Sequence, residues 1–127
     1  SDLLLAAGYD IADLVWVEVE VADLEGGVLG EAVGRRVSID RDAGGRGWFV
    51  DPTPRDAEEF GPARAGIARA RVPGPADGRI DLLSTVIHEL GHTIGLRHGD
   101  APFMAGRLAA GTRALPPRVV LDAVAVR

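Results

Sequence analysis

The sequence contains no cysteine, lysine, asparagine or glutamine. Without cysteine, neither a disulfide framework nor thiolate chemistry is available to the protein. No apolar run approaches the length that a bilayer span requires, so we do not expect a membrane span. No signal peptide is visible at the start of the chain, and the sequence therefore does not report export directly.

The chain also has fewer basic than acidic residues. The chain carries 14 basic and 19 acidic side chains, for a formal net charge of -5, and its arginines are scattered. A nucleic-acid partner is not expected, because such proteins concentrate basic residues on one face. A chain of 127 residues with 46% hydrophobic residues fits one soluble globular domain with its own core. Nothing in the composition indicates an oligomer.

The first part of the chain predicts a small antiparallel or mixed sheet. Residues 14–22 alternate strictly, with Val15, Val17, Val19 and Val21 on one face, which is typical of a half-buried strand. Further strands are expected at residues 28–34 and 36–40, the latter with Val37 and Ile39 inward. A glycine-rich turn at residues 42–47 then leads to a short apolar run at residues 48–50.

The remainder of the chain predicts a long loop followed by helices. Residues 51–79 are rich in proline, glycine, alanine and arginine, with a helical turn or two expected at 55–60 or 63–70. Residues 81–95 form the strongest helix prediction, capped by Asp81 and ended by Gly95. Shorter helices are expected at residues 2–8 and, after two prolines, at 119–126.

The predicted main helix carries the pattern His-Glu-x-x-His. Residues four apart on a helix differ by only ~40° in direction and ~6 Å in height. His88 and His92 can therefore direct their imidazoles to one metal ion. Glu89 projects about 100° away from His88, where it can act on a metal-bound water as general base and then as general acid.

A third histidine, His98, makes the pattern more specific. On a continuous helix, His98 would lie ~15 Å along the axis from His88, too far to share its ion. Gly95 lies between His92 and His98 and tolerates the positive φ of a sharp turn, which would bring His98 back. Three neutral imidazoles leave the fourth tetrahedral position open, as in a catalytic zinc site.

The alternative is that these histidines merely pack against the core. A bare His-Glu-x-x-His can arise by chance, and a lone histidine near an apolar helix face is usually structural. Here all three histidines of the chain fall within residues 88–98. We therefore favour one catalytic zinc ion held by His88, His92 and His98.

The motif residues resemble those of the metzincin clan of zinc metallopeptidases. His88, Glu89, His92, Gly95 and His98 occupy every position of the His-Glu-x-x-His-x-x-Gly-x-x-His signature. Met104 is the single methionine and follows the third histidine, which resembles the clan's Met-turn beneath the metal. Ordinary core filling is the alternative role for that methionine. Within the clan, a narrower resemblance is carried by residues 39–54 together with residues 81–96. These segments resemble a matrixin-like domain of bacterial secreted or surface proteins.

This resemblance implies an α+β zincin-like fold, with a small twisted mixed sheet, an active-site helix, a Met-turn and a C-terminal helix. It implies a single catalytic domain over residues 1–127, divided into subdomains 1–95 and 96–127. The implied activity is a zinc metalloendopeptidase acting on protein or peptide substrates, with Glu89 as base and acid. The implied location is secreted or cell-surface. An extended substrate would pair with the strand at residues 28–34, although an ordinary connecting strand is the alternative for that segment.

The sequence also departs from known branches of the clan. Gly106 stands where astacins and serralysins have a tyrosine, two residues after the methionine. Residues 105–108 lack the Pro-x-Tyr that matrixins usually have, so Leu108 and Leu115 are the predicted wall of the substrate pocket. No further histidine remains for a second, structural zinc.

Two interpretations stay open beside the endopeptidase. One is a zinc-binding module of a larger surface protein without peptidase activity, against which the intact Glu89 argues. The other is a peptidase whose substrate is its own parent polypeptide. Calcium binding by Asp40, Asp42 and Asp51 is an alternative to a solvated turn, which we favour.

Overall fold

The computed structural model describes residues 18–34, 36–51, 58–93 and 95–116. Its first part is a three-stranded mixed sheet in the order β1-β3-β2. β1 runs parallel to β3, and β2 runs antiparallel to β3. The bounds of these strands are β1 Glu18–Ala22, β2 Gly30–Val33 and β3 Arg36–Asp40. The prediction of a small mixed sheet is confirmed.

Two shorter sheets and one α-helix complete the described residues. β4 pairs in parallel with β6, and β5 pairs antiparallel with β7. The bounds are β4 Trp48–Phe49, β5 Ile67–Arg69, β6 Ile80–Asp81, α2 Leu82–Thr93, the 3-10 helix η2 Pro102–Met104, and β7 Thr112–Ala114. This is a small α+β fold, as predicted.

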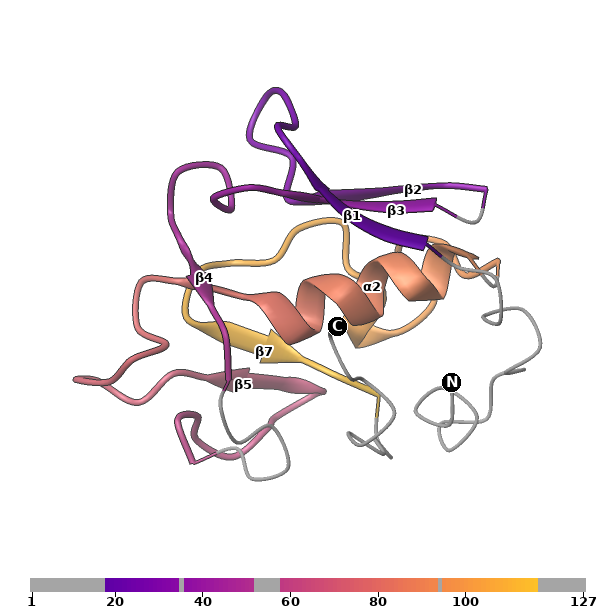
Figure 1. The fold of residues 1–127 in the computed structure, drawn as a ribbon. Helices are drawn as coiled ribbons and strands as arrows, with labels where there is room; N and C mark the ends of the chain where they lie inside the picture. The colour runs from indigo at the N-terminus through magenta and orange to yellow at the C-terminus, as the bar shows by residue number, and fades with distance from the viewer. Residues whose placement is uncertain (1–17, 35, 52–57, 94, 117–127) are drawn as a thin grey trace.

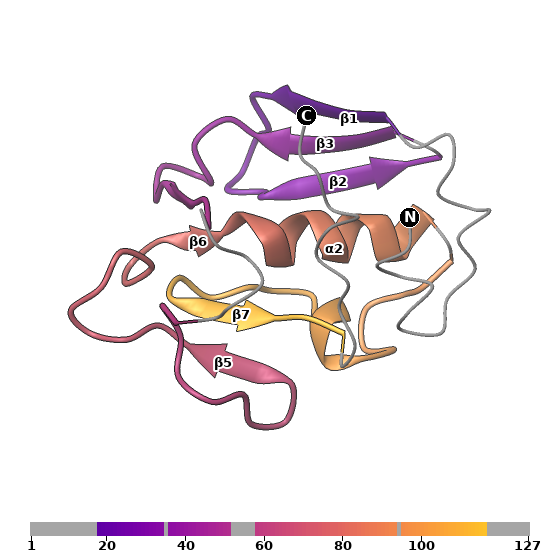
Figure 2. The same ribbon diagram turned by 60° about the horizontal axis from the view of Figure 1, so that its bottom comes forward.

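Helix α2 lies between the three-stranded sheet and the β5–β7 pair (Figures 1 and 2). On the sheet side, Val86 packs with the buried side chains of Val37 and Ile39. On the other side, Ile87 packs with Phe103, Met104 and Ala114. The broad apolar face of α2 thus separates two hydrophobic clusters, which hold the helix firmly on both sides.

The start of α2 is capped as the sequence predicts. The Asp81 carboxylate accepts the backbone N–H of Ser84 at 3.3 Å and the Ser84 hydroxyl at 2.6 Å. This satisfies one of the amide groups that a helix leaves unpaired at its N-terminus. The same Ser84 oxygen accepts the backbone N–H of Ala114 at 3.0 Å, which joins α2 to β7.

The helical turn predicted for residues 63–70 is wrong. The chain there has positive φ at Ala65 and Gly66, of 52° and 80°, which no continuing right-handed helix accommodates. It then enters β5, whose backbone groups pair with β7. Non-local strand pairing thus overrode the local helical propensity.

The predicted burial of the first strand is also wrong at its C-terminal end, because the side chain of Val21 is 68% exposed. Helix α2 packs against β2 and β3, and β1 lies on the far side of β3. Val37 and Ile39 of β3 are buried as predicted, with exposures of 0% and 4%.

Several predicted elements lie outside the described residues. These are the helices at 2–8 and 119–126, the beginning of the first strand at 14–17, and the first half of the helical turn at 55–60. None of the helices in the described ranges combines the length and the hydrophobicity of a membrane-spanning segment.

Candidate metal centre

The three histidines of the chain come together at the C-terminal half of α2. His88 and His92 lie one turn apart on the helix, and His98 approaches from the following loop. Each offers one ring nitrogen, and these nitrogens all lie within 4.8 Å of one another. The three residues predicted from the sequence therefore form a group that can hold a metal ion.

The turn after α2 explains how His98 reaches the helix. Gly95 has φ 96°, a left-handed conformation that strongly favours glycine. Its N–H bonds to the His92 carbonyl at 3.1 Å, and the Leu96 N–H bonds to the Gly91 carbonyl at 3.0 Å. This pair of bonds is the Schellman arrangement, which ends a helix and reverses the chain. The predicted role of Gly95 as the helix terminator is confirmed.

Backbone carbonyls orient two of the imidazoles. His88 Nδ1 lies 3.1 Å from the Phe103 carbonyl oxygen, and His92 Nδ1 lies 2.9 Å from that of Leu96. A carbonyl oxygen only accepts hydrogen bonds, so both Nδ1 atoms must carry the proton. In the neutral rings, each Nε2 then presents a lone pair. Fixing the tautomer through the second ring nitrogen is the usual arrangement for metal-ligating histidines.

The two Nε2 atoms face each other at 3.1 Å. Two lone pairs at this distance repel unless a proton or a cation lies between or beside them. Burial lowers the pKa of His88, and the neighbouring His92 and His98 lower it further, although the hydrogen bond to Phe103 acts in the opposite sense. The neutral form that ligates metals is thereby favoured. The donor set fits a divalent transition-metal ion such as zinc.

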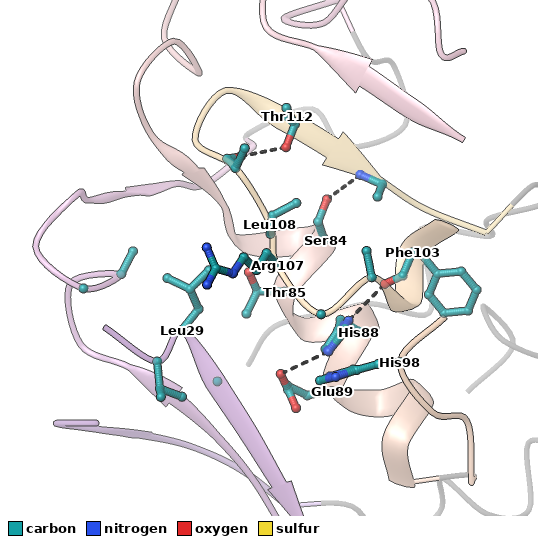
Figure 3. A pocket seen from close by; sticks show the side chains of 18 of the residues that line it. Leu29, Ser84, Thr85, His88, Glu89, His98, Phe103, Arg107, Leu108 and Thr112 are labelled. Atoms are coloured by element: carbon teal, nitrogen blue, oxygen red, sulfur yellow. Dashed lines mark hydrogen bonds and ion pairs between the residues drawn. The ribbon is translucent and has the colours of Figure 1, made fainter. Parts of the chain in front are cut away.

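Glu89 projects toward the same centre from the sheet-facing side of the helix. Its Oε2 lies 3.9 Å from His88 Nε2 (Figure 3), and the residue is 6% exposed. Burial raises the pKa of Glu89 to about 7; His92 lowers it and Glu31 raises it. A carboxyl group with such a pKa can both accept and release a proton near neutral pH.

Two glycines that the sequence analysis did not single out make room for the site. A Cβ on Gly30 would lie 3.0 Å from Glu89 Cγ, so the backbone of β2 lies close to the Glu89 side chain. A Cβ on Gly91 would overlap Met104 Sδ. The sequence did contain a signal for both residues. Gly30 lies inside a predicted strand and Gly91 inside a predicted helix, and a glycine in either place indicates close packing of the backbone.

Met104 is fully buried beneath α2, in the cluster with Ile87 and Phe103. The Gly99 N–H bonds to the Met104 carbonyl at 3.0 Å and ties η2 to the loop that carries His98. Two residues later, Gly106 lies against the His98 ring, since a Cβ there would be 3.4 Å from His98 Nδ1. The specific role of Met104 as the floor of a metal site remains a prediction.

The histidines and Glu89 line a cavity of about 1000 Å³. One wall is the edge strand β2 with the turn before it, and the other wall is the loop after η2 together with β5 and β7. Leu108 lines this cavity as predicted for the pocket wall, whereas Leu115 packs into the neighbouring core cluster and is not part of the lining.

The three aspartates considered for calcium serve other contacts. Asp40 accepts the backbone N–H groups of Gly44 and Leu24, both at 2.8 Å. Asp42 accepts that of Gly45, and Asp51 pairs with Arg113 at 3.0 Å. Over the described ranges, the histidine group is the one cluster with the spacing of metal ligands. The favoured interpretation as a solvated turn therefore holds for the exposed Asp42, whereas it is wrong for Asp40, which is 4% exposed, and for Asp51, whose side chain is buried against Arg113.

Comparison of the chain with protein-family models, with curated proteins and with solved structures gave no match. The site therefore has to be interpreted from its own geometry.

Proposed function

We propose that this protein is a zinc-dependent endopeptidase of the metzincin type. The observation that carries the proposal is the convergence of His88, His92 and His98 beside the buried carboxyl group of Glu89. Three neutral nitrogen ligands leave one coordination position for water or substrate, whereas closed structural zinc sites use four protein ligands. A structural site would not require a carboxyl group at that position.

A bound zinc ion would polarise the scissile carbonyl and lower the pKa of a water molecule. In this proposal Glu89 takes the proton of the attacking water and later delivers it to the leaving amine. The carbonyls of Phe103 and Leu96 keep the imidazoles of His88 and His92 in the required tautomer.

The substrate of this proposal is an extended peptide. β2 is an edge strand that lines the cavity on the side of Glu89, so its free backbone groups are available to a peptide that adds to the sheet. Gly30, with no side chain, allows this edge to lie close to Glu89. By the resemblance of its motif, we further propose that the protein acts at the cell surface or outside the cell.

The decisive experiment measures cleavage of a denatured protein by the zinc-loaded chain and by Glu89→Gln. We expect the variant to retain zinc and to lose activity by at least about a hundredfold, the lower range for a general acid–base group. A strong chelator should abolish activity, and added zinc should restore it. Glu58→Gln, which alters an exposed carboxylate outside the cavity, is the matched control.

Equal cleavage by wild type and Glu89→Gln would contradict the role of Glu89. Absence of cleavage by either protein, with zinc bound, would favour the zinc-binding module without peptidase activity. Cleavage confined to a longer version of the same polypeptide would favour the self-processing enzyme.

A further inference from the structure

Three arginines line the same cavity as the histidines: Arg46, Arg69 and Arg107. They come from the turn before β4, from β5 and from the loop after η2. Against them, the acidic residues of the lining are Glu31 and Glu89. The chain as a whole has a net charge of -5, so this cavity concentrates positive charge in an otherwise acidic protein.

These guanidinium groups are not engaged in ion pairs with the described part of the chain. Other arginines differ: Arg41 pairs with Asp23, and Arg113 with Asp81. The side chains of the three cavity arginines therefore remain available for a ligand of opposite charge.

Arg46 and Arg69 lie on the side of the cavity toward the N-terminal end of α2. Arg69 pairs in register with Thr112, and both line the cavity, while the adjacent pair of Ala68 and Arg113 is buried in the core. Gly47, next to Arg46, accepts the backbone N–H of Ile80 just before the helix begins. The positive charge is thus placed to one side of the histidine cluster.

Arg107 is the best placed of the three. It follows Gly106, where a Cβ would lie 3.4 Å from His98 Nδ1. Figure 3 shows its side chain pointing toward the wall that carries Leu29. A carboxylate entering the cavity next to the metal centre would meet this guanidinium, whose planar donors match a carboxylate in a two-bond geometry.

We propose that the cavity selects acidic peptides, with Arg107 as the residue that recognises a glutamate or aspartate side chain on one side of the scissile bond. Arg46 and Arg69 add to the positive potential that draws such a substrate into a concave site. This inference rests on the proposed peptidase function and specifies its substrate class.

The test uses matched sets of peptides that differ only by Glu, Gln or Lys at each position flanking the cleaved bond. We expect kcat/KM of the wild type to favour Glu by about fivefold at one of these positions, the upper range for a partly exposed ion pair. The preference should decrease as salt is raised. Arg107→Gln should remove it, and Arg107→Glu should reverse it in favour of a Lys peptide.

The matched control is Arg79→Gln, which removes an exposed arginine outside the cavity and should keep the preference. Cleavage of the Glu and Gln peptides at equal rates would overturn the inference and leave the proposed peptidase function standing. If neither these peptides nor the denatured protein nor a longer version of the polypeptide is cleaved, the peptidase function fails. In that case, fluorescence anisotropy with the zinc-loaded protein decides the inference: tighter binding of the Glu peptide, lost in Arg107→Gln, supports it, and equal binding overturns it.

Discussion

At the scale of single residues, the site depends on which nitrogen of each imidazole carries the proton. The carbonyls of Phe103 and Leu96 accept from Nδ1 of His88 and His92, and this directs both Nε2 lone pairs to one point. His98 completes the group from a loop and is itself exposed. Its contribution to metal binding can therefore be separated from its contribution to folding.

His98→Ala tests this separation. Removal of a direct ligand should weaken zinc binding by at least about 100-fold, since loss of a residue that only supports a ligand already costs 10–100-fold. The affinity is measured by competition with a chromophoric chelator. Because the side chain is exposed, the free energy of unfolding of the metal-free protein should change little.

Arg97→Ala removes the exposed neighbour of His98 and should leave zinc affinity unchanged. An unaltered affinity in His98→Ala would show that His98 is not a ligand.

At the scale of elements, the turn after β3 is held by one carboxylate. Asp40 accepts the N–H of Gly44 within the turn and that of Leu24 from the segment after β1. These hydrogen bonds lower the pKa of Asp40 to about 2, and the bond from Gly44 has the largest effect. The turn precedes β4, whose neighbour β6 leads directly into α2, so this carboxylate helps to place the cavity wall at Arg46.

Asp40→Asn should be less stable than the wild type above pH 4. The ionised carboxylate is favoured in the folded state, because its pKa lies below the ordinary value of 3.8. Its stabilising contribution is therefore fully present above about pH 4 and is lost as the pH falls toward about 2. Urea unfolding of both proteins across this range should show the difference in free energy narrowing.

The exposed Asp77 offers the comparison, because Asp77→Asn removes a carboxylate without these turn contacts. A difference between wild type and Asp40→Asn that stays constant from pH 6 to pH 2 would contradict the assignment.

At the scale of the whole molecule, a buried ion network joins distant parts of the chain. Arg113 of β7 donates to Asp81 at the start of α2 at 2.8 and 3.0 Å, and pairs with Asp51 after β4 at 3.0 Å. Its guanidinium also lies 4.4 Å from the ring centre of Phe60. Burial alone would lower the pKa of Arg113, but the hydrogen bonds and charges of the two aspartates outweigh it and raise the pKa.

Arg113→Met should destabilise the fold by about 3–5 kcal/mol, because it leaves two buried carboxylates without their cation. The free energy of unfolding, obtained from urea titration of the metal-free protein, measures this effect. Arg64→Met, at an exposed position, should change stability by less than about 0.5 kcal/mol. A loss in Arg113→Met as small as that of the control would show that the network does not support the fold.

Much of the local structure was predictable from the sequence. The cap at Asp81, the end of the helix at Gly95 and the strand at Arg36–Asp40 follow from short-range chemistry: a side chain that accepts nearby amides, a residue that tolerates positive φ, and alternation of apolar residues. The spacing of His88 and His92 places them on one side of any helix that forms there. The residues of the metal group were determined at this level.

Tertiary structure alone decided the surroundings of that group. The pairing of β5 with β7 turned residues predicted as helix into a cavity wall, and the position of α2 beneath β2 and β3 left Val21 exposed. The gathering of Arg46, Arg69 and Arg107 has no sequence signature, because the three residues are far apart in the chain and meet only through strand pairing and loop packing. Local sequence patterns encode which residues can ligate a metal, while non-local contacts determine which other side chains surround the metal-binding group.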